Sequence, residues 1–367
     1  MSTSNKICND GASSKSNDDD VCEMNDMLQN MSTADSDNST DISNTCANCG
    51  KEGSDVNNTC NKCNSVMYCN AACKKRHRHK HKKECEEYLR LAAEQAAKLH
   101  DEVLFKRPPP EYEDCPICFL RMPTLCSGFR YQICCGKIIC SGCDYAPVYD
   151  DKGNVITEET CPFCRTPYPA TSGEAIERMK QRVEAGDDIA IRNLGNYYAN
   201  RQFGFPQDYT KALDLWHQAA ELGNANANYS IGNAYLRGDG VEVDEKKATH
   251  HWEIAAMKGS SHARYNLGSL EASAGNMDRA LKHYMIAVRA GCADSLDMIK
   301  RLYSSRHATK EDYMEALRSY QEYLNEVKSV QRDEAAASHK KQSVRRAATK
   351  SFQTDKAAAA DDEYKYY

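Results

Sequence analysis

The sequence predicts a multidomain protein in which two small, metal-stabilised modules precede an all-α repeat solenoid. Two observations carry this expectation. Sixteen of the 19 cysteines in the 367-residue chain lie between Cys46 and Cys164. After that stretch, glycine recurs at Gly186, Gly223 and Gly259, a period near 36 residues. Such a period is typical of helical repeats that stack into one continuous core.

The polarity of the chain bears on its compartment. No apolar segment follows a basic start, and no run reaches the roughly 18 apolar residues of a membrane-spanning helix. Outside secretory compartments, clustered cysteines bind metal or act in catalysis more often than they form a disulfide framework. We therefore expect an intracellular protein, cytoplasmic or nuclear, with no membrane partner.

Charge is distributed in opposite blocks that the net charge of −5 hides. Residues 1–45 hold two basic and nine acidic residues among many Ser, Asn and Thr, and we expect a disordered acidic tail. Residues 46–85 hold nine basic and three acidic residues. Their basic run, Lys74–Lys83, is interpreted as the solvated face of a helix, and a nuclear-import signal or a nucleic-acid surface is the alternative.

Residues 46–85 contain eight sulfur and nitrogen ligands in four ordered pairs. Eight such ligands are what two tetrahedral Zn²⁺ ions require, and no position is left open for water, so both sites are predicted to be structural. A segment this short has no adequate apolar core, and metal binding supplies its folding energy. The ligands are Cys46, Cys49, Cys60, Cys63, Cys69, Cys73, His81 and Cys85.

This ligand order, with Tyr68 just before the third pair, resembles the MYND zinc finger over residues 46–85. The resemblance implies that the pairs interleave, the first and third holding one ion and the second and fourth the other. It also implies binding of proline-containing peptides in partner proteins. Lys74 and Arg78 stand where the family commonly has the Gln and Trp that help to form the peptide groove.

Residues 86–111 are predicted to form a helix and a proline linker. Leu89, Leu99 and Val103 belong to an apolar series with helical spacing within residues 86–106. Pro108–Pro110 ends that helix and stiffens the link to the next module.

Residues 112–169 form a second module with eight cysteines in four pairs, enough for two more tetrahedral zinc ions and four in all. Its spacing resembles a RING domain across residues 115–165. Lys137 stands at the usual His position and is no zinc ligand when protonated. The neighbouring Cys134 is the natural substitute and Cys126 the weaker rival, which gives an all-Cys RING variant. The ligands are then Cys115, Cys118, Cys134, Cys135, Cys140, Cys143, Cys161 and Cys164.

The RING resemblance implies that the first and third pairs share one ion and the second and fourth the other. RING ubiquitin ligases have no catalytic nucleophile and instead hold a ubiquitin-charged conjugating enzyme. By resemblance, Ile117 and Pro162 lie at the apolar contact positions inside the first and last Cys pairs. Arg165 matches the cation that bridges conjugating enzyme and ubiquitin, where a guanidinium donates several hydrogen bonds at once. Ordinary loop packing and a solvated charge are the alternatives.

Residues 172–303 resemble SEL-like repeats, short relatives of tetratricopeptide repeats. Each unit carries a Leu-Gly or Ile-Gly pair in its first helix and a large aromatic residue in its second. The pairs begin at Leu194, Ile231 and Leu267, and the aromatic residues are Trp216, Trp252 and Tyr284. Their regular period predicts core packing rather than ligand stacking. Residues 304–330 are predicted to form a capping helix with Thr309 as its N-cap, and residues 331–367 a disordered tail.

Two functions fit these features. The first is a RING-type E3 ubiquitin ligase that recruits a conjugating enzyme through residues 112–169 and substrates or adaptors through the MYND finger and the repeats. The alternative is a non-catalytic zinc-finger scaffold or transcriptional co-regulator that binds proteins through all of its parts. No P-loop, dinucleotide-binding glycine motif or serine-hydrolase elbow indicates another catalytic class.

Overall fold

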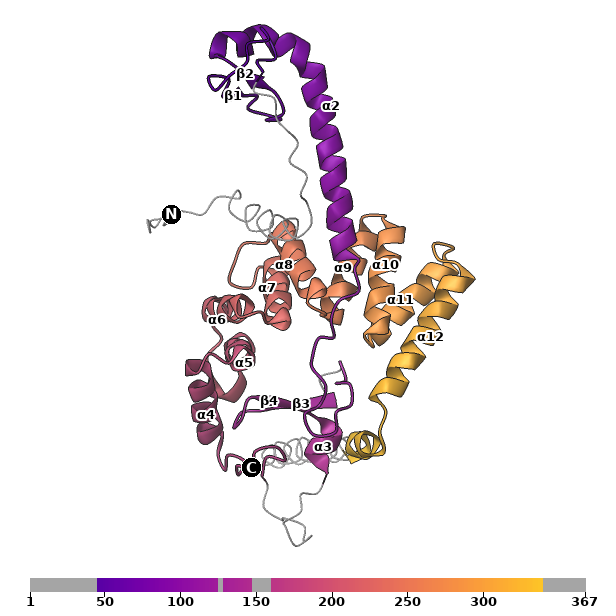
Figure 1. Cartoon of the computed structure of the whole chain (residues 1–367). Coiled ribbons are helices and arrows are strands. Elements are labelled where there is room, and N and C mark those ends of the chain that lie inside the picture. The colour runs from indigo at the N-terminus through magenta and orange to yellow at the C-terminus, as the bar shows by residue number, and fades with distance from the viewer. Residues whose placement is uncertain (1–44, 125–127, 147–159, 339–367) are drawn as a thin grey trace, which may run out of the picture. The chain divides into compact units, whose positions relative to one another are not determined.

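The computed structural model describes residues 45–124, 128–146 and 160–338 (Figure 1). It divides into two compact units, residues 1–96 and 97–367. Most of both predicted tails lies outside the described residues, as does Cys126. Among the described helices, none is long and apolar enough to cross a membrane.

The first unit contains a short hairpin and the start of a long helix. Strands β1 (Asn58–Thr59) and β2 (Met67–Tyr68) pair antiparallel, and α2 (Ala71–Leu104) follows. The side chain of Asn70 accepts the N–H of Cys73 at 2.9 Å and so caps the helix start. The sequence predicts a helix only over residues 86–106. In the structure the helix already begins at Ala71, because its cap, Asn70, lies within the Cys-rich segment before the predicted start.

The apolar core of the first unit is very small. It comprises Cys46, Val56 and Tyr68, with partly buried cysteines around them. So little apolar area cannot offset the entropy of ordering the segment. The fold of this unit therefore needs a source of stability other than its apolar core.

The second unit begins with a module of two strands and one short helix, within residues 112–169, here called the second Cys module. Strands β3 (Phe129–Gln132) and β4 (Lys137–Cys140) pair antiparallel, and α3 (Ser141–Tyr145) follows directly. Four of the six buried residues in its core are cysteines, so this core too contains little apolar side chain. The core residues are Cys115, Met122, Ile139, Cys140, Cys143 and Cys161.

The rest of the second unit is a helical solenoid. Its helices are α4 (Ser172–Glu184), α5 (Asp188–Ala199), α6 (Tyr209–Glu221), α7 (Ala225–Arg237), α8 (Glu245–Met257), α9 (Ser261–Ser273), α10 (Met277–Arg289), α11 (Ala293–Ser304) and α12 (Lys310–Val327), with a 3-10 turn, η2 (Gln202–Gly204). Polar side chains cap most helix starts by accepting the N–H three residues further on. These caps are Thr171, Asp187, Asp208, Asn224, Asp244, Ser260 and Thr309.

Glycine and aromatic residues pair within each repeat. A glycine in the first helix leaves room for the ring from the second, because an added Cβ would come within 3.0 Å of ring atoms. The pairs are Gly195–Trp216, Gly232–Trp252 and Gly268–Tyr284. The three rings are at most 4% exposed. The prediction that they are core residues is confirmed.

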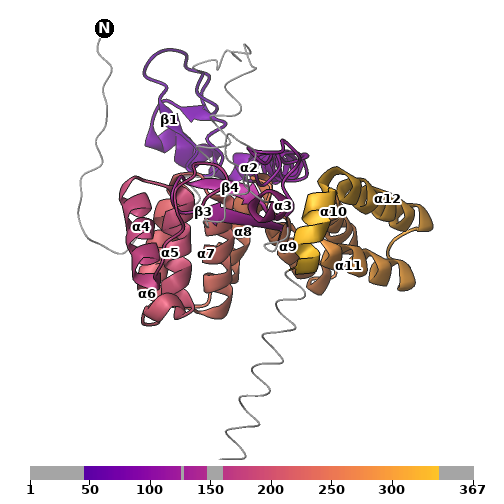
Figure 2. The same ribbon diagram turned by 90° about the horizontal axis from the view of Figure 1, so that it is seen from below.

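The second Cys module contacts both ends of the solenoid (Figure 2). At one end, Tyr131 donates its hydroxyl to Asp187 Oδ2 at 2.8 Å. At the other, the Tyr323 hydroxyl accepts the N–H of Thr124 at 2.9 Å. These two hydrogen bonds therefore tie the second Cys module to both ends of the solenoid.

The segment after α12 differs from expectation. Residues 330–338 are helical, whereas the sequence predicts a disordered tail from residue 331. Arg332 is 6% exposed and Ala335 is fully buried. The prediction is wrong for these residues because burial of Arg332 and Ala335 orders a segment that composition alone leaves without a core.

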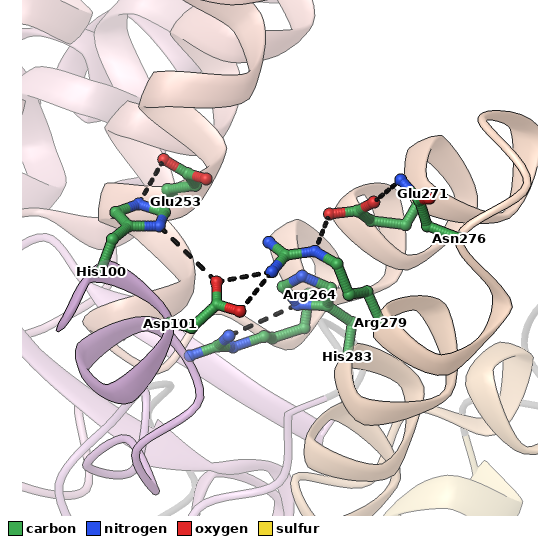
Figure 3. A network of polar contacts seen from close by, with 8 residues as sticks. All are labelled: His100, Asp101, Glu253, Arg264, Glu271, Asn276, Arg279 and His283. Carbon is green, nitrogen blue, oxygen red and sulfur yellow. Dashed lines mark hydrogen bonds and ion pairs between the residues drawn. The ribbon is translucent and has the colours of Figure 1, made fainter. Parts of the chain in front are cut away.

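The last turns of α2, which belong to the second unit, contact the solenoid through a polar network (Figure 3). Both carboxylate oxygens of Asp101 accept from Arg279 Nη1, at 2.5 and 2.6 Å. His100 Nε2 lies 3.3 Å from Glu253 Oε2. These charge-assisted contacts fix the end of α2 against α8 and α10.

Below this network a histidine is buried beside arginine. His283 Nδ1 lies 3.4 Å from Arg264 Nη1, and both residues are 1% exposed. Because a guanidinium can only donate, Nδ1 accepts and the imidazole is neutral. Burial, followed by the charges of Arg264 and Arg279, lowers the pKa of His283 from 6.5 to about 3.

We expect acid to destabilise the solenoid through this histidine. The unfolded chain takes up the proton near pH 6.5 and the folded chain only near pH 3, so stability falls as the pH drops through that window. His283 adds at most about 1.4 kcal/mol per pH unit to the slope of the free energy of unfolding against pH. Urea unfolding followed by tryptophan fluorescence at several pH values measures it. The His283→Gln variant should show a shallower dependence, and an identical one would contradict the assignment.

Candidate metal centres

The structure brings the sixteen side chains proposed as ligands into four groups. Within each group, one ligand atom from every residue lies within 4.8 Å of the others. In both modules the first pair joins the third, and the second joins the fourth. The groups are Cys46, Cys49, Cys69 and Cys73; Cys60, Cys63, His81 and Cys85; Cys115, Cys118, Cys140 and Cys143; and Cys134, Cys135, Cys161 and Cys164.

The spacing of the sulfur atoms fits tetrahedral zinc. Two sulfurs, each about 2.3 Å from one tetrahedral ion, lie about 3.8 Å apart. In the first unit, the Sγ atoms of Cys49 and Cys69 are 3.6 Å apart, and those of Cys60 and Cys85 are 3.9 Å apart. All four cysteines are free thiols rather than disulfide partners. The donor set therefore suits two closed structural zinc sites.

His81 is oriented as a ligand of the second group. Its Nε2 lies 3.2 Å from Cys63 Sγ, while Nδ1 points toward Glu84 at 3.7 Å. The ring of His77 stacks on that of His81 with centroids 5.9 Å apart, and its Nδ1 lies 3.2 Å from the Tyr68 hydroxyl. His77 therefore supports the ligand ring, and the structure does not add it to the group.

The second Cys module repeats this geometry with sulfur alone. The sulfur–sulfur distances are 3.8 Å for Cys118 and Cys140, 4.0 Å for Cys135 and Cys161, and 3.3 Å for Cys134 and Cys164. Cys134 thus lies in a four-cysteine group, whereas Lys137 is exposed on β4. The geometry accommodates an all-Cys donor set without a histidine.

Four of the Cys pairs close the same tight turn. In each, the residue after the second cysteine donates its N–H to the carbonyl of the first cysteine at 2.9 to 3.0 Å. That residue has a positive φ, which is uncommon without glycine and persists only where surrounding contacts fix the turn. The residues are Gly50 (φ 70°), Asn64 (φ 51°), Phe119 (φ 57°) and Arg165 (φ 62°). Both thiols of each pair are thereby held on one turn.

At least one thiol in each module favours the thiolate form that binds metal, whereas burial raises the pKa of others, among them Cys69 and Cys143. The backbone N–H of Cys69 lowers the pKa of the Cys46 thiol to about 6. A hydrogen bond from the Cys140 thiol lowers the pKa of Cys115 to about 4. A thiolate is the form of cysteine that ligates zinc. Each module therefore holds at least one thiol prepared for metal at neutral pH.

The residues expected to contact a conjugating enzyme differ in exposure. Ile117 is half-buried and packs against the core of the second Cys module, and Pro162 is also half-buried. Arg165 is exposed. Two large apolar residues that sequence reasoning missed are exposed beside them, Phe119 at 76% and Phe163 at 42%. Their position in the tight turns, where a side chain has little room to fold inward, is the signal that could have found them.

The basic run lies on α2. Its Lys and Arg side chains other than Lys74 are exposed, as expected for a solvated helix face. Lys74 Nζ instead donates to the carbonyl of Thr59 at 2.5 Å and also contacts Asn61. Where the MYND family commonly has Gln, this chain therefore uses a lysine to tie α2 to β1.

Family models match two parts of the chain. Residues 46–85 match the model of the MYND finger, and residues 188–224 and 225–260 each match that of the Sel1 repeat. No RING-type finger is named among these matches. A zinc-binding MYND finger and Sel1 repeats together fit a protein-interaction scaffold.

Solved structures similar to the chain include repeat proteins from bacteria. A Sel1 repeat protein from Oxalobacter formigenes is 28% identical over 42% of this chain and 64% of its own, with a TM-score of 0.37. A protective antigen of uropathogenic Escherichia coli strains, displaying an SLR fold, is 30% identical over 40% of this chain and 32% of its own, with a TM-score of 0.35. The chain thus spans less than two thirds of each.

Proposed function

We propose that this protein is an intracellular RING-type E3 ubiquitin ligase, cytoplasmic or nuclear, built on a protein-interaction scaffold. The second Cys module recruits a ubiquitin-charged conjugating enzyme. The MYND finger and the repeats bring substrates or adaptors to it. Sixteen cysteine and histidine ligands hold four structural zinc ions, and zinc contributes folding energy rather than catalysis.

The observation that carries this proposal is the interleaving of the Cys pairs in the second module. The first and third pairs form one group, and the second and fourth form another, with β3, β4 and α3 between them. Each group has four protein ligands, so no position remains for a metal-bound water. A module of this kind has no chemistry of its own to offer. Any reaction must come from an enzyme that it recruits.

The last Cys pair offers a surface suited to that recruitment. Phe163, between the two cysteines of the pair, is 42% exposed, and Pro162 precedes it. Arg165 follows the pair and is exposed as well. An apolar anchor beside an arginine is the combination enriched in the energetic centres of protein interfaces.

Self-ubiquitination with a panel of conjugating enzymes tests the proposal. Arg165→Asn is the sharpest variant, because asparagine tolerates the positive φ of this turn while it removes the guanidinium. We expect it to slow ubiquitin transfer about 10-fold or more, since hydrogen bonds to charged groups contribute about 1.5–3 kcal/mol. Arg165→Lys, which keeps the charge but not the fork, should be intermediate.

The matched control is Asn64→Gly, at the same turn position in the first unit, because glycine also tolerates the positive φ. It should leave transfer unchanged. Zinc content and helical circular dichroism of every variant should equal those of the parent protein. If the folded, zinc-loaded protein transfers no ubiquitin with any conjugating enzyme, the ligase proposal fails. The function is then a non-catalytic scaffold or transcriptional co-regulator, for which the MYND finger and the repeats suffice.

A further inference from the structure

Arg332 lies against one of the cysteine groups of the second Cys module. It belongs to the helical residues 330–338. Ser329 caps the start of this helical segment, because its Oγ accepts the Arg332 N–H at 3.2 Å. A Cβ on Gly142, in α3, would come within 2.8 Å of the Arg332 backbone nitrogen. The segment and α3 are therefore in close backbone contact, as Figure 1 also shows.

The guanidinium of Arg332 reaches the first Cys turn of that module. Nη1 donates to the carbonyl of Arg121 at 2.8 Å, and Nη2 donates to the carbonyl of Leu120 at 3.3 Å. Nη2 also lies 3.8 Å from Cys118 Sγ. These contacts hold the backbone just after the cysteine as well as the sulfur itself. Nη1 further donates to Val327 at 2.8 Å, which ties the end of α12 to the same point.

The charge of Arg332 needs a partner that its hydrogen bonds do not supply. The side chain is 6% exposed, and within the described residues its acceptors are carbonyl oxygens and one sulfur, with no carboxylate. A buried cation is costly unless an opposite charge compensates it. Four thiolates around Zn²⁺ carry a net charge of about −2, which would supply that compensation. Four neutral thiols would not.

We propose that Arg332 is a positioning residue for the zinc centre of Cys115, Cys118, Cys140 and Cys143, and that the charged centre in turn holds residues 329–338 in place. The segment is then a metal-dependent latch between the end of the solenoid and the second Cys module. The metal orders the latch, and the latch slows metal loss. This rests on zinc occupancy of that group and not on ligase activity, so each can fail without the other.

Two measurements on the full chain test the latch. The first is hydrogen exchange of the amides in residues 330–338, with zinc bound and after chelation. The second is the rate at which a chromogenic chelator removes zinc. We expect chelation to accelerate exchange in this segment of the parent protein. Arg332→Gln should accelerate it even with zinc bound, and should weaken binding of one of the four ions by about 10–100-fold, as is usual when a residue that orients a ligand is lost.

Two control variants separate charge from structure. Lys328→Gln removes an equal charge from an exposed position just before this segment and should change neither readout. Arg332→Lys keeps the charge near the sulfur and should restore part of the zinc retention. Exchange in residues 330–338 that ignores zinc would overturn the proposal. So would unchanged zinc release in Arg332→Gln, or equal acceleration for all four ions, which would signal general unfolding.

Discussion

Removal of zinc will unfold both Cys modules and leave the repeat solenoid folded. The buried core of the first unit is only Cys46, Val56 and Tyr68, and the second Cys module is held mainly by cysteines. Structural zinc contributes on the order of 10 kcal/mol or more of folding free energy per ion, far above what such cores can replace. The solenoid instead has buried apolar clusters that contain no zinc ligand.

The position of the tryptophans makes this prediction measurable. The chain has two, Trp216 and Trp252, and both are buried in the solenoid. Tryptophan fluorescence during urea unfolding therefore reports on the solenoid alone, and its midpoint should move little on chelation. Limited proteolysis should at the same time cut within residues 46–85 and 112–169. Elemental analysis of the untreated protein should give four zinc ions.

Single-site variants provide the controls for zinc removal. Cys161→Ala, at a fully buried ligand, should lower the zinc content and make the second Cys module sensitive to protease. Cys292→Ala, outside every cysteine group, should change neither. Two ions instead of four, or a tryptophan transition that follows chelator concentration, would contradict the division into metal-dependent and metal-independent parts.

The local chemistry of the cysteine groups could be predicted from the sequence, because two cysteines with two residues between them can close a tight turn around one metal ion. Which pairs share an ion is a long-range property, and spacing alone does not decide it. The resemblance to known fingers supplied that pairing, and the structure places the ligands in the same groups. The exposure of Phe119 and Phe163 is indicated only by their position in the tight Cys turns, since apolar residues are ordinarily assigned to cores.

Contacts between distant segments were the least predictable part of the fold. Arg332 and Cys118 are 214 residues apart in sequence, and nothing in the Ala-rich composition of residues 331–338 indicates that Arg332 is buried. The ion pair of Asp101 with Arg279 joins residues 178 positions apart, and no pattern in the sequence indicates it either. The repeats, in contrast, can be recognised from the sequence, because the same types of side chain must pack against the same neighbours in every unit.

Asn196 and Ser269 show how the repeats differ in detail. Each directly follows the repeat glycine and hydrogen-bonds the aromatic residue of its unit, Trp216 Nε1 at 3.1 Å and the Tyr284 hydroxyl at 3.2 Å. In the middle unit, the equivalent Asn233 accepts from Asn266 at 3.2 Å instead. Trp252 Nε1 is left without a hydrogen-bond partner among the described residues.

Gly232→Ala will destabilise the solenoid by about 3 kcal/mol, the upper end of the usual cost of overpacking a core. The added methyl would lie 2.5 Å from Cδ1 and 2.6 Å from Nε1 of Trp252, and 3.0 Å from the carbonyl oxygen of Ala248. Trp252 is 2% exposed and has little space to retreat. The clash exceeds the roughly 1 kcal/mol by which alanine is the better helix former. Urea unfolding followed by helical circular dichroism measures the change.

Gly173→Ala is the matched control for this substitution. Gly173 also lies in a helix, but an added Cβ would meet only Thr171 Oγ1, at 3.8 Å. It should therefore stabilise the protein slightly, by up to about 1 kcal/mol. Opposite signs for the two glycines would separate close approach from helix propensity. Equal signs would contradict the geometry of the repeat core.

Trp252→Phe should rescue part of the loss in Gly232→Ala. Phenylalanine lacks the pyrrole edge that the new methyl would strike, and Trp252 Nε1 makes no hydrogen bond that the change would break. Residues in direct contact commonly show coupling energies of about 0.5–3 kcal/mol, so the double variant should be more stable than the sum of the singles. Strict additivity would mean that the methyl does not meet the ring. Trp216→Phe should rescue Gly195→Ala less well, because the loss of Trp216 Nε1 also removes its hydrogen bond to Asn196.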